Sequence, residues 1–198
     1  MMKSLSTALL VLLLSALALA QAGEIQRLFE AGHYQQVVDA TSPEAPPEIV
    51  HLAAQSYQKL GATDQAVLMY ARLAERPETD VWRFIGLSGR QLVEGQFDEA
   101  TASARQAVAV APEEASAHYQ LGLALARQQQ WAEAATAFDA ATERQPFLAY
   151  AHYYGGLMHY RANRPDRMAI RFEQFLTLAP EAPERPEVLS IMRTIRGR

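Results

Sequence analysis

Three of the five histidines and one serine are the residues of this sequence whose types and spacing suggest chemistry. His118, His152 and His159 carry ring nitrogens that can bind a metal or transfer a proton. Ser88 lies in Gly86-Leu87-Ser88-Gly89, which superficially resembles the turn that presents a nucleophilic serine. However, His152 and His159 lie about two helical turns apart without a third ligand, and no strand precedes Ser88. The sequence therefore predicts no catalytic residue, no metal site and no cofactor.

The composition narrows the chemistry further. The chain has no cysteine, which removes thiol catalysis, zinc–thiolate sites and disulfides. It contains no glycine-rich loop of the kind that cradles phosphates. The formal net charge of −4 argues against a general nucleic-acid binder. We therefore expect the protein not to be an enzyme and not to bind nucleic acid.

The spacing of the reactive side chains indicates a structural role for them. His118 and His152 lie 34 residues apart, and several other series keep this step. These series are Pro112, Pro146 and Pro180; Gly61, Gly95, Gln129 and Asn163; Ala54, Ser88, Gly122 and Gly156; and Ala66, Ala100, Ala134 and Met168. One fixed period of this length is typical of a repeat array. Ser88, His118 and His152 each have an equivalent one period away, so we expect them to serve the scaffold.

Each 34-residue unit is predicted to form two amphipathic helices. Apolar residues recur at spacings of three and four along each half of the clearest unit, residues 115–148. A turn near residues 128–130 separates the halves, and Pro146 ends the second one because proline cannot continue a helix. Gly61, Gly95 and Asn163 suit a left-handed turn, whereas Gln129 suits it less well.

This unit resembles the tetratricopeptide repeat. The residues that carry the resemblance are Leu121, Gly122, Leu125, Trp131, Ala134, Phe138, Ala141 and Pro146. The neighbouring units match in part, and Pro165 and Met168 depart from the usual aromatic residue and alanine in the last unit. The resemblance implies an all-α fold, a right-handed superhelical solenoid of antiparallel helix pairs.

The same periodicity predicts the domain organisation. Residues 23–183 form the array, with a short first unit at about 24–46 and full units at 47–80, 81–114, 115–148 and 149–182. Residues 184–198 are predicted to form a C-terminal capping helix, because Val188, Ile191, Met192 and Ile195 make one apolar stripe. A solenoid needs such a cap, since its last repeat would otherwise expose its core face.

The resemblance also implies where a partner binds. In this family the first helix of each pair lines a concave groove, which usually holds a peptide or a helix. The partner-binding residues predicted on this basis are Trp82, Ile85, Gly89, Tyr119, Leu123, Tyr150, Tyr153, Leu157 and Tyr160. Gly86 and Gly89 could leave room beside Trp82 for an inserted side chain. Two alternatives stay open: these aromatic residues pack against neighbouring repeats, or they bind an aromatic small molecule.

The N-terminal residues are typical of a secretory signal peptide. Lys3 precedes an uncharged, mostly apolar stretch that ends in Ala18-Leu19-Ala20. Residues 1–20 are therefore predicted to be removed, with cleavage after Ala20 or after Ala22. The alternative is an uncleaved membrane anchor, because the uncharged residues 4–23 reach about the length of a membrane span.

Together these observations predict a non-catalytic scaffold or adaptor of the bacterial cell envelope, exported to the periplasm. It would hold a protein or peptide partner in its concave groove. The alternative is a structural subunit, anchored in the inner membrane and facing the periplasm, that uses its convex face. The imperfect first repeat and the tyrosine-rich edges leave room for self-association.

Overall fold

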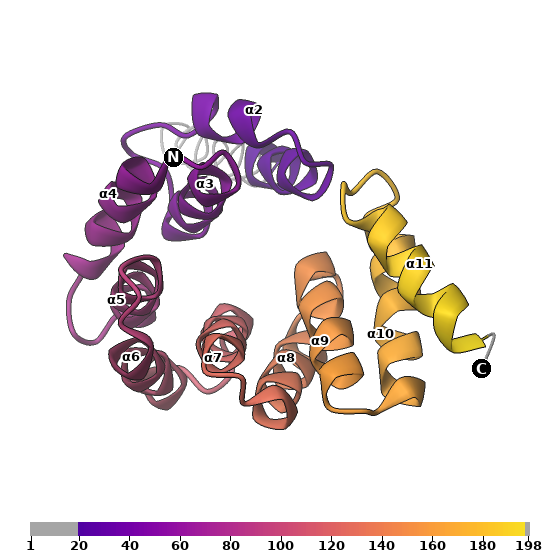
Figure 1. Ribbon diagram of the computed structural model, residues 1–198. Helices are drawn as coiled ribbons and strands as arrows, with labels where there is room; N and C mark the ends of the chain where they lie inside the picture. The colour runs from indigo at the N-terminus through magenta and orange to yellow at the C-terminus, as the bar shows by residue number, and fades with distance from the viewer. Residues whose placement is uncertain (1–19, 197–198) are drawn as a thin grey trace, which may run out of the picture.

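The structure, a computed structural model, describes residues 20–196, which form helices joined by short turns (Figure 1). A helix at residues 20–30 and the short α2 (Tyr34–Asp39) come first. Four helix pairs follow: α3 (Pro47–Lys59) with α4 (Thr63–Ala74), α5 (Val81–Val93) with α6 (Phe97–Val110), α7 (Ala115–Arg127) with α8 (Trp131–Arg144), and α9 (Ala149–Arg161) with α10 (Pro165–Leu178). The last helix is α11 (Arg185–Arg196). The predicted all-α superhelical array with a C-terminal capping helix is confirmed.

Local chemistry explains where these helices begin and turn. The Asp80 carboxylate accepts a hydrogen bond from the Trp82 N–H at the start of α5, and Glu114 does the same for Ser116 one period later. The turn inside each pair contains one residue in the left-handed region, with φ of 74° at Gly61 and 61° at Gln129. Gln129 thus adopts a left-handed backbone conformation, which suits glycine better than glutamine.

The two histidines one period apart make the same contact. Nε2 of His118 lies 2.7 Å from the carbonyl oxygen of Pro112, and Nε2 of His152 lies 2.9 Å from that of Pro146. Each ring thereby ties a first helix to the loop that enters it. The prediction that both histidines serve one scaffold role is confirmed.

Glycines allow the helices to approach closely. A Cβ atom at Gly86 would lie 2.5 Å from Cβ of Leu73, and one at Gly89 would lie 2.3 Å from the ring of Tyr70. A Cβ atom at Gly122 on α7 would likewise lie 2.8 Å from the ring of Phe138 on α8. The side of Gly86 and Gly89 on which a side chain would lie is thus filled by α4, so these glycines serve close packing of the helices.

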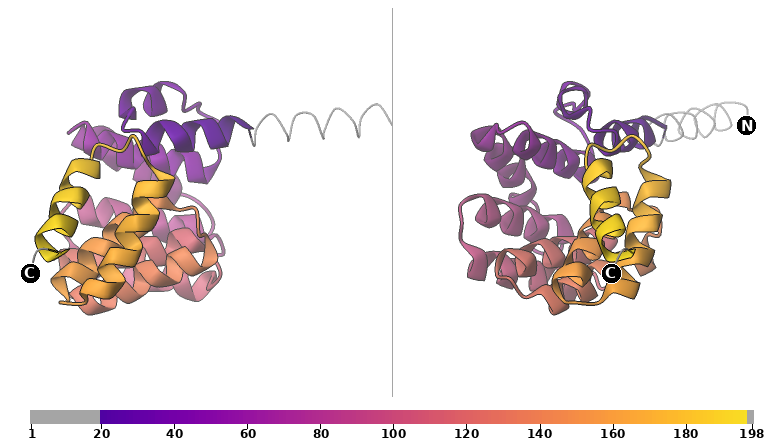
Figure 2. Two further views of the ribbon diagram at one scale, coloured as in Figure 1. Left: turned by 90° about the vertical axis from the view of Figure 1, so that its right-hand side faces the viewer. Right: turned by 45° about the vertical axis from the view of Figure 1, so that its right-hand side comes forward.

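The two ends of the array meet and close it into a ring (Figures 1 and 2). The segment before α11 lies beside the N-terminal helices, where Pro183 packs against the Gly32 turn. Nζ of Lys59 on α3 lies 2.7 Å from an oxygen of Glu184. The ring of Phe29 lies 5.1 Å from that of Tyr150 on α9. The concave side is therefore enclosed rather than an open groove.

Candidate functional site

The first helices of the pairs, α3, α5, α7 and α9, line the inner side of the ring, and α4, α6, α8 and α10 lie outside them (Figure 1). Two cavities lie on the inner side, with volumes of about 390 and 340 Å³. The larger one, here called cavity 1, is lined mainly by apolar side chains, among them Leu92, Leu123, Trp131, Tyr154 and Leu157. The smaller one, cavity 2, lies among the starts of the first helices and includes Trp82, Leu148 and Tyr150.

The two cavities share a wall. Phe29, Gln55 and Tyr119 line both of them and come from the N-terminal helix, α3 and α7. All three side chains thus lie at a constriction between the cavities. A partner segment that occupied both cavities would therefore contact all three.

The predicted binding residues are divided between the cavities and the core. Gly89, Tyr119, Leu123 and Leu157 line cavity 1, and Trp82, Tyr119 and Tyr150 line cavity 2. Ile85 is fully buried in the core beneath them.

Tyr153 and Tyr160 line neither cavity. Tyr153 is buried and donates a hydrogen bond of 2.9 Å to Glu187 at the start of α11. Tyr160 is 43% exposed near the end of α9. The structure thus brings most, but not all, of the predicted set to the cavities.

The aromatic side chains form one cluster across the ring closure. Tyr150 contacts the rings of Phe29 and Phe175, and Tyr153 lies 5.0 Å from Tyr154. Apart from this cluster, the Trp82 ring contacts the His51 ring at 5.7 Å, and both rings line cavity 2. These contacts match the alternative in which the aromatic residues pack against one another, although several of the same rings also line the cavities.

The polar groups of the inner side are buried and mostly uncharged. Burial lowers the pKa of His51 to about 4, so its ring is neutral near pH 7. Nε2 of Gln55 lies 3.3 Å from Nε2 of His51, and Gln120 donates to the Ser88 hydroxyl at 3.1 Å. These hydrogen bonds account for Ser88 as a scaffold residue.

Two residues at the ends of the array escaped sequence reasoning: Phe29, which lines both cavities, and Glu184, which contacts Lys59 at the ring closure. Phe29 lies in the degenerate first unit, and Glu184 lies in the predicted cap. Two features of the sequence could have indicated the contact of Glu184. Lys59 is the only lysine other than Lys3, and Glu184 lies one 34-residue period after Tyr150, whose hydroxyl donates to it at 2.8 Å.

A separate ion cluster joins α8 to α9 and α10. The buried Asp139 carboxylate on α8 accepts a hydrogen bond from Nε of Arg171 at 2.8 Å and lies 3.1 Å from Nε2 of His159. Arg167 lies 3.4 Å away. Burial raises the pKa of Asp139, but His159 and Arg171 outweigh it, so the pKa is lowered overall.

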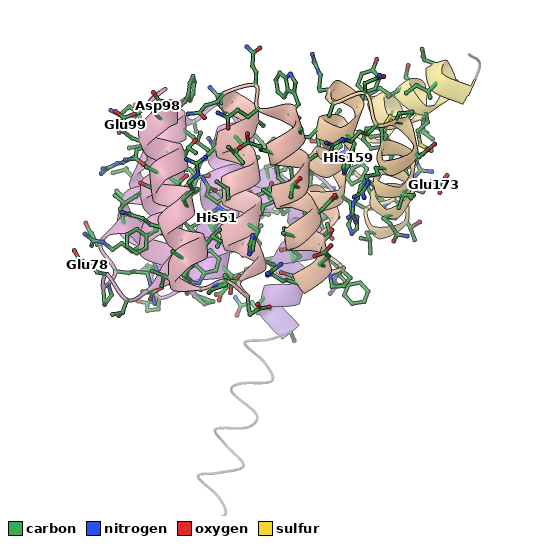
Figure 3. The ribbon with its side chains drawn as sticks, turned by 90° about the horizontal axis from the view of Figure 1, so that it is seen from below. His51, Glu78, Asp98, Glu99, His159 and Glu173 are labelled. Carbon is green, nitrogen blue, oxygen red and sulfur yellow. The ribbon has the colours of Figure 1, made fainter. Side chains whose placement is uncertain are left out.

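Among the described residues, the other histidines do not gather with carboxylates. His51 lies on α3 and His159 on α9, and their labels lie apart in Figure 3. Within residues 20–196 no group of three or more His, Cys, Asp or Glu residues is arranged to hold a metal ion. No helix in the same range is long and apolar enough to cross a membrane. The predicted signal peptide lies almost wholly outside the described residues.

Comparisons with known proteins connect this fold to a family. Two family models described as tetratricopeptide repeat match residues 51–79, 90–148 and 126–183, together more than half of the chain. No curated protein matches the sequence.

Two solved structures resemble the fold of this chain. TTC0263, described as a thermophilic TPR protein in Thermus thermophilus, is 18% identical, with a TM-score of 0.63 over 87% of this chain and 97% of that one. MamA from Desulfovibrio magneticus RS-1 is 21% identical, with a TM-score of 0.50 over 81% of this chain and 94% of that one. At these identities the likeness concerns the fold alone.

Proposed function

This chain belongs to the tetratricopeptide repeat family, and from that premise we propose that it is a non-catalytic scaffold that holds a segment of a partner protein on its concave side. The observation that carries the proposal is the pair of cavities lined by side chains of α3, α5, α7 and α9. Aromatic side chains in such cavities supply large contact area at low entropic cost, as in protein–protein hot spots.

The dimensions of the cavities favour inserted side chains. Both volumes lie at the lower end of the range of ligand pockets, which is about 300–1,000 Å³. The constriction at Phe29, Gln55 and Tyr119 divides the inner side. We therefore infer that a partner places one or two apolar anchors in the ring, with Leu123 and Leu157 of cavity 1 as the main contacts.

The location that we propose is the bacterial cell envelope, after export. Its support is the N-terminal pattern of Lys3, an apolar stretch and Ala18-Leu19-Ala20. The test is cell fractionation followed by mass spectrometry of the mature N-terminus. A protein that begins near Gln21 or Gly23 supports cleavage, retention of residues 1–20 in the membrane fraction supports the tethered alternative, and an uncleaved cytoplasmic protein contradicts both.

The binding test uses cavity residues that are only half-buried. Trp82 and Tyr153 are each 6% exposed, so truncating them would also destabilise the fold. Leu123→Glu and Leu157→Glu instead place a carboxylate at the surface of cavity 1. We expect each to weaken capture of the co-purifying partner by at least about tenfold, with unchanged helicity by circular dichroism.

The matched control is a leucine on the outer face. Leu68 on α4 is 55% exposed and lines neither cavity. Leu68→Glu should leave capture unchanged if the inner side binds the partner. Loss of capture in Leu68→Glu, with normal capture in the two cavity variants, would favour binding through the convex face.

A further inference from the structure

The ring closure has a polar part that involves few residues and lies beside the apolar contact of Phe29 with Tyr150. The Glu184 carboxylate accepts hydrogen bonds from Nζ of Lys59 at 2.7 Å and from the Tyr150 hydroxyl at 2.8 Å. The Tyr34 hydroxyl lies 3.2 Å from the Tyr150 hydroxyl. Nζ of Lys59 also lies 5.9 Å from the ring centroid of Tyr34 and 5.4 Å from that of Tyr150.

This contact joins segments that the repeat architecture alone would keep apart. Lys59 and Glu184 are 125 residues apart in sequence, whereas a solenoid repeat contacts only its neighbours. The contact is also the point where the first unit, through Phe29 and Tyr34, meets the last repeat, through Tyr150. Breaking it would leave the closure to the apolar contacts of the first unit, those of Phe29 with Tyr150 and of the Gly32 turn with Pro183, and would weaken the hold of the two ends on each other.

Release of the first unit would change the cavities directly. Phe29 lines both cavities from the N-terminal side, while Tyr150 lines cavity 2 and Tyr154 lines cavity 1 from α9. If the ends separate, Phe29 withdraws from Tyr150, and the constriction between the cavities widens. The closed ring therefore restricts the surface to which a partner would bind.

We infer that the contact of Glu184 with Lys59 and Tyr150 is an autoinhibitory latch that controls access to the concave side. The inference rests on the proposed function, since it is the partner site whose access the latch controls. Solvent reaches the latch from the Lys59 side. The Lys59 side chain is 30% exposed, whereas that of Glu184 is 11% exposed, so salt and competing charges act on the pair through the lysine.

Ring opening can be measured on the full chain with spin labels, because the protein has no cysteine. His33→Cys and Glu181→Cys place labels at exposed sites on the two sides of the closure. Pulsed electron–electron double resonance should give one short distance between the two labels in the parent protein. Glu184→Gln, Lys59→Met and about 1 M NaCl should each add a longer distance, the salt because the Debye length falls to about 3 Å. Glu78→Gln, which removes a surface ion pair with Arg83, is the control and should change nothing.

Access to the cavities needs a second probe that does not depend on a partner. The dye 1-anilinonaphthalene-8-sulfonate reports exposed apolar surface through its fluorescence. Its apparent affinity should increase about tenfold in Glu184→Gln and Lys59→Met if the latch leaves about one molecule in ten open. The two substitutions change the net charge in opposite directions, so a common increase is not an effect of dye charge.

Each outcome decides the inference. Unchanged distances in Glu184→Gln and Lys59→Met would show that packing alone closes the ring, and longer distances without increased dye binding would show that opening exposes nothing. If Lys59→Met fails to fold, Tyr150→Phe and the salt series on the parent still test the latch. Loss of partner capture in Leu68→Glu alone would overturn the proposed function while leaving these latch measurements intact.

Discussion

At the scale of single residues, backbone conformation and side-chain identity disagree at one turn. Gln129 has a φ of 61° in the turn between α7 and α8, where Gly61 and Gly95 occupy the equivalent turns with φ of 74° and 80°. A residue with a Cβ atom pays about 1–2 kcal/mol for this left-handed conformation, whereas glycine does not. The repeat therefore carries a local strain that the two preceding repeats lack.

Gln129→Gly should relieve that strain. Part of the gain is offset because glycine is more flexible in the unfolded chain, so we expect the free energy of unfolding to rise by about 0.5–1 kcal/mol. Urea denaturation followed by circular dichroism measures it. Gln129→Ala keeps the strain and should be nearly neutral, so equal stabilisation by both substitutions would contradict this explanation.

Asp139 should govern part of the acid stability. Its pKa is lowered in the folded state by His159 and Arg171, so its stabilising contribution is fully present above its unfolded pKa of about 3.9. As the pH falls through the folded pKa, that contribution is lost. Asp139→Asn should therefore lower stability by about 2–4 kcal/mol at pH 7, because it leaves the largely buried Arg171 guanidinium without its carboxylate, and should flatten the pH dependence below about pH 4.

The comparison that tests this assignment is a pH series of unfolding free energies for the parent, Asp139→Asn and Glu143→Gln. Glu143 is an exposed carboxylate on the same helix, so its substitution should keep the acid dependence of the parent. If the free energy of unfolding of Asp139→Asn keeps the acid dependence of the parent, that dependence comes from other carboxylates.

At the scale of helices, glycine decides how closely two of them approach. A Cβ atom at Gly86 would meet Cβ of Leu73 at 2.5 Å and backbone atoms of α4 at 2.7 Å, and backbone cannot move aside easily. We expect Gly86→Ala to lower the free energy of unfolding by about 1–3 kcal/mol despite the better helix propensity of alanine.

Gly155 on α9 provides the matched position. A Cβ atom there would meet Cβ of Phe138 at 3.3 Å, a contact that a small shift relieves. Gly155→Ala should therefore be near neutral, because the helix propensity of alanine offsets the tighter packing. Thermal denaturation of the two variants in parallel checks the contrast, and a similar loss in both would show that close approach at Gly86 is not the determinant.

The helices and turns were predictable because local chemistry fixes them. The apolar spacing, the left-handed turn residues and the closing prolines all lie within one 34-residue period, so adjacent repeats report the same structure several times. His118 and Ser88 could be assigned to the scaffold for the same reason. Repetition separates shared structural residues from those that differ between repeats.

The cavities and the ring closure could not be predicted in the same way. Curvature is the sum of small rotations between successive repeats, and no single residue encodes it. Phe29 and Glu184 become neighbours of Tyr150 only after all four pairs have stacked. Sequence reasoning thus placed Trp82, Tyr119 and Tyr150 on the inner side, but missed the residues that enclose them.

At the scale of the whole molecule, closure changes how stability is distributed. In an open solenoid each repeat gains stability only from its neighbours, and the terminal repeats fray first. Here the first unit also contacts α9 through Tyr34 and the segment before α11 through the Gly32 turn, and Lys59 on α3 pairs with Glu184. The two ends therefore become neighbours, and each should protect the other from local opening.

Hydrogen exchange detects this mutual protection. Lys59→Met removes the ammonium group from the closure while keeping a long apolar side chain. We expect amide exchange to rise by about fivefold or more in residues 20–40 and also in residues 179–195, since a loss of about 1 kcal/mol raises local opening by that factor. Exchange within α6 and α7, on the opposite side of the ring, should stay at the parent rate. Faster exchange confined to α3 and its neighbours would instead mean that the array behaves as an open solenoid, whose ends touch without stabilising each other.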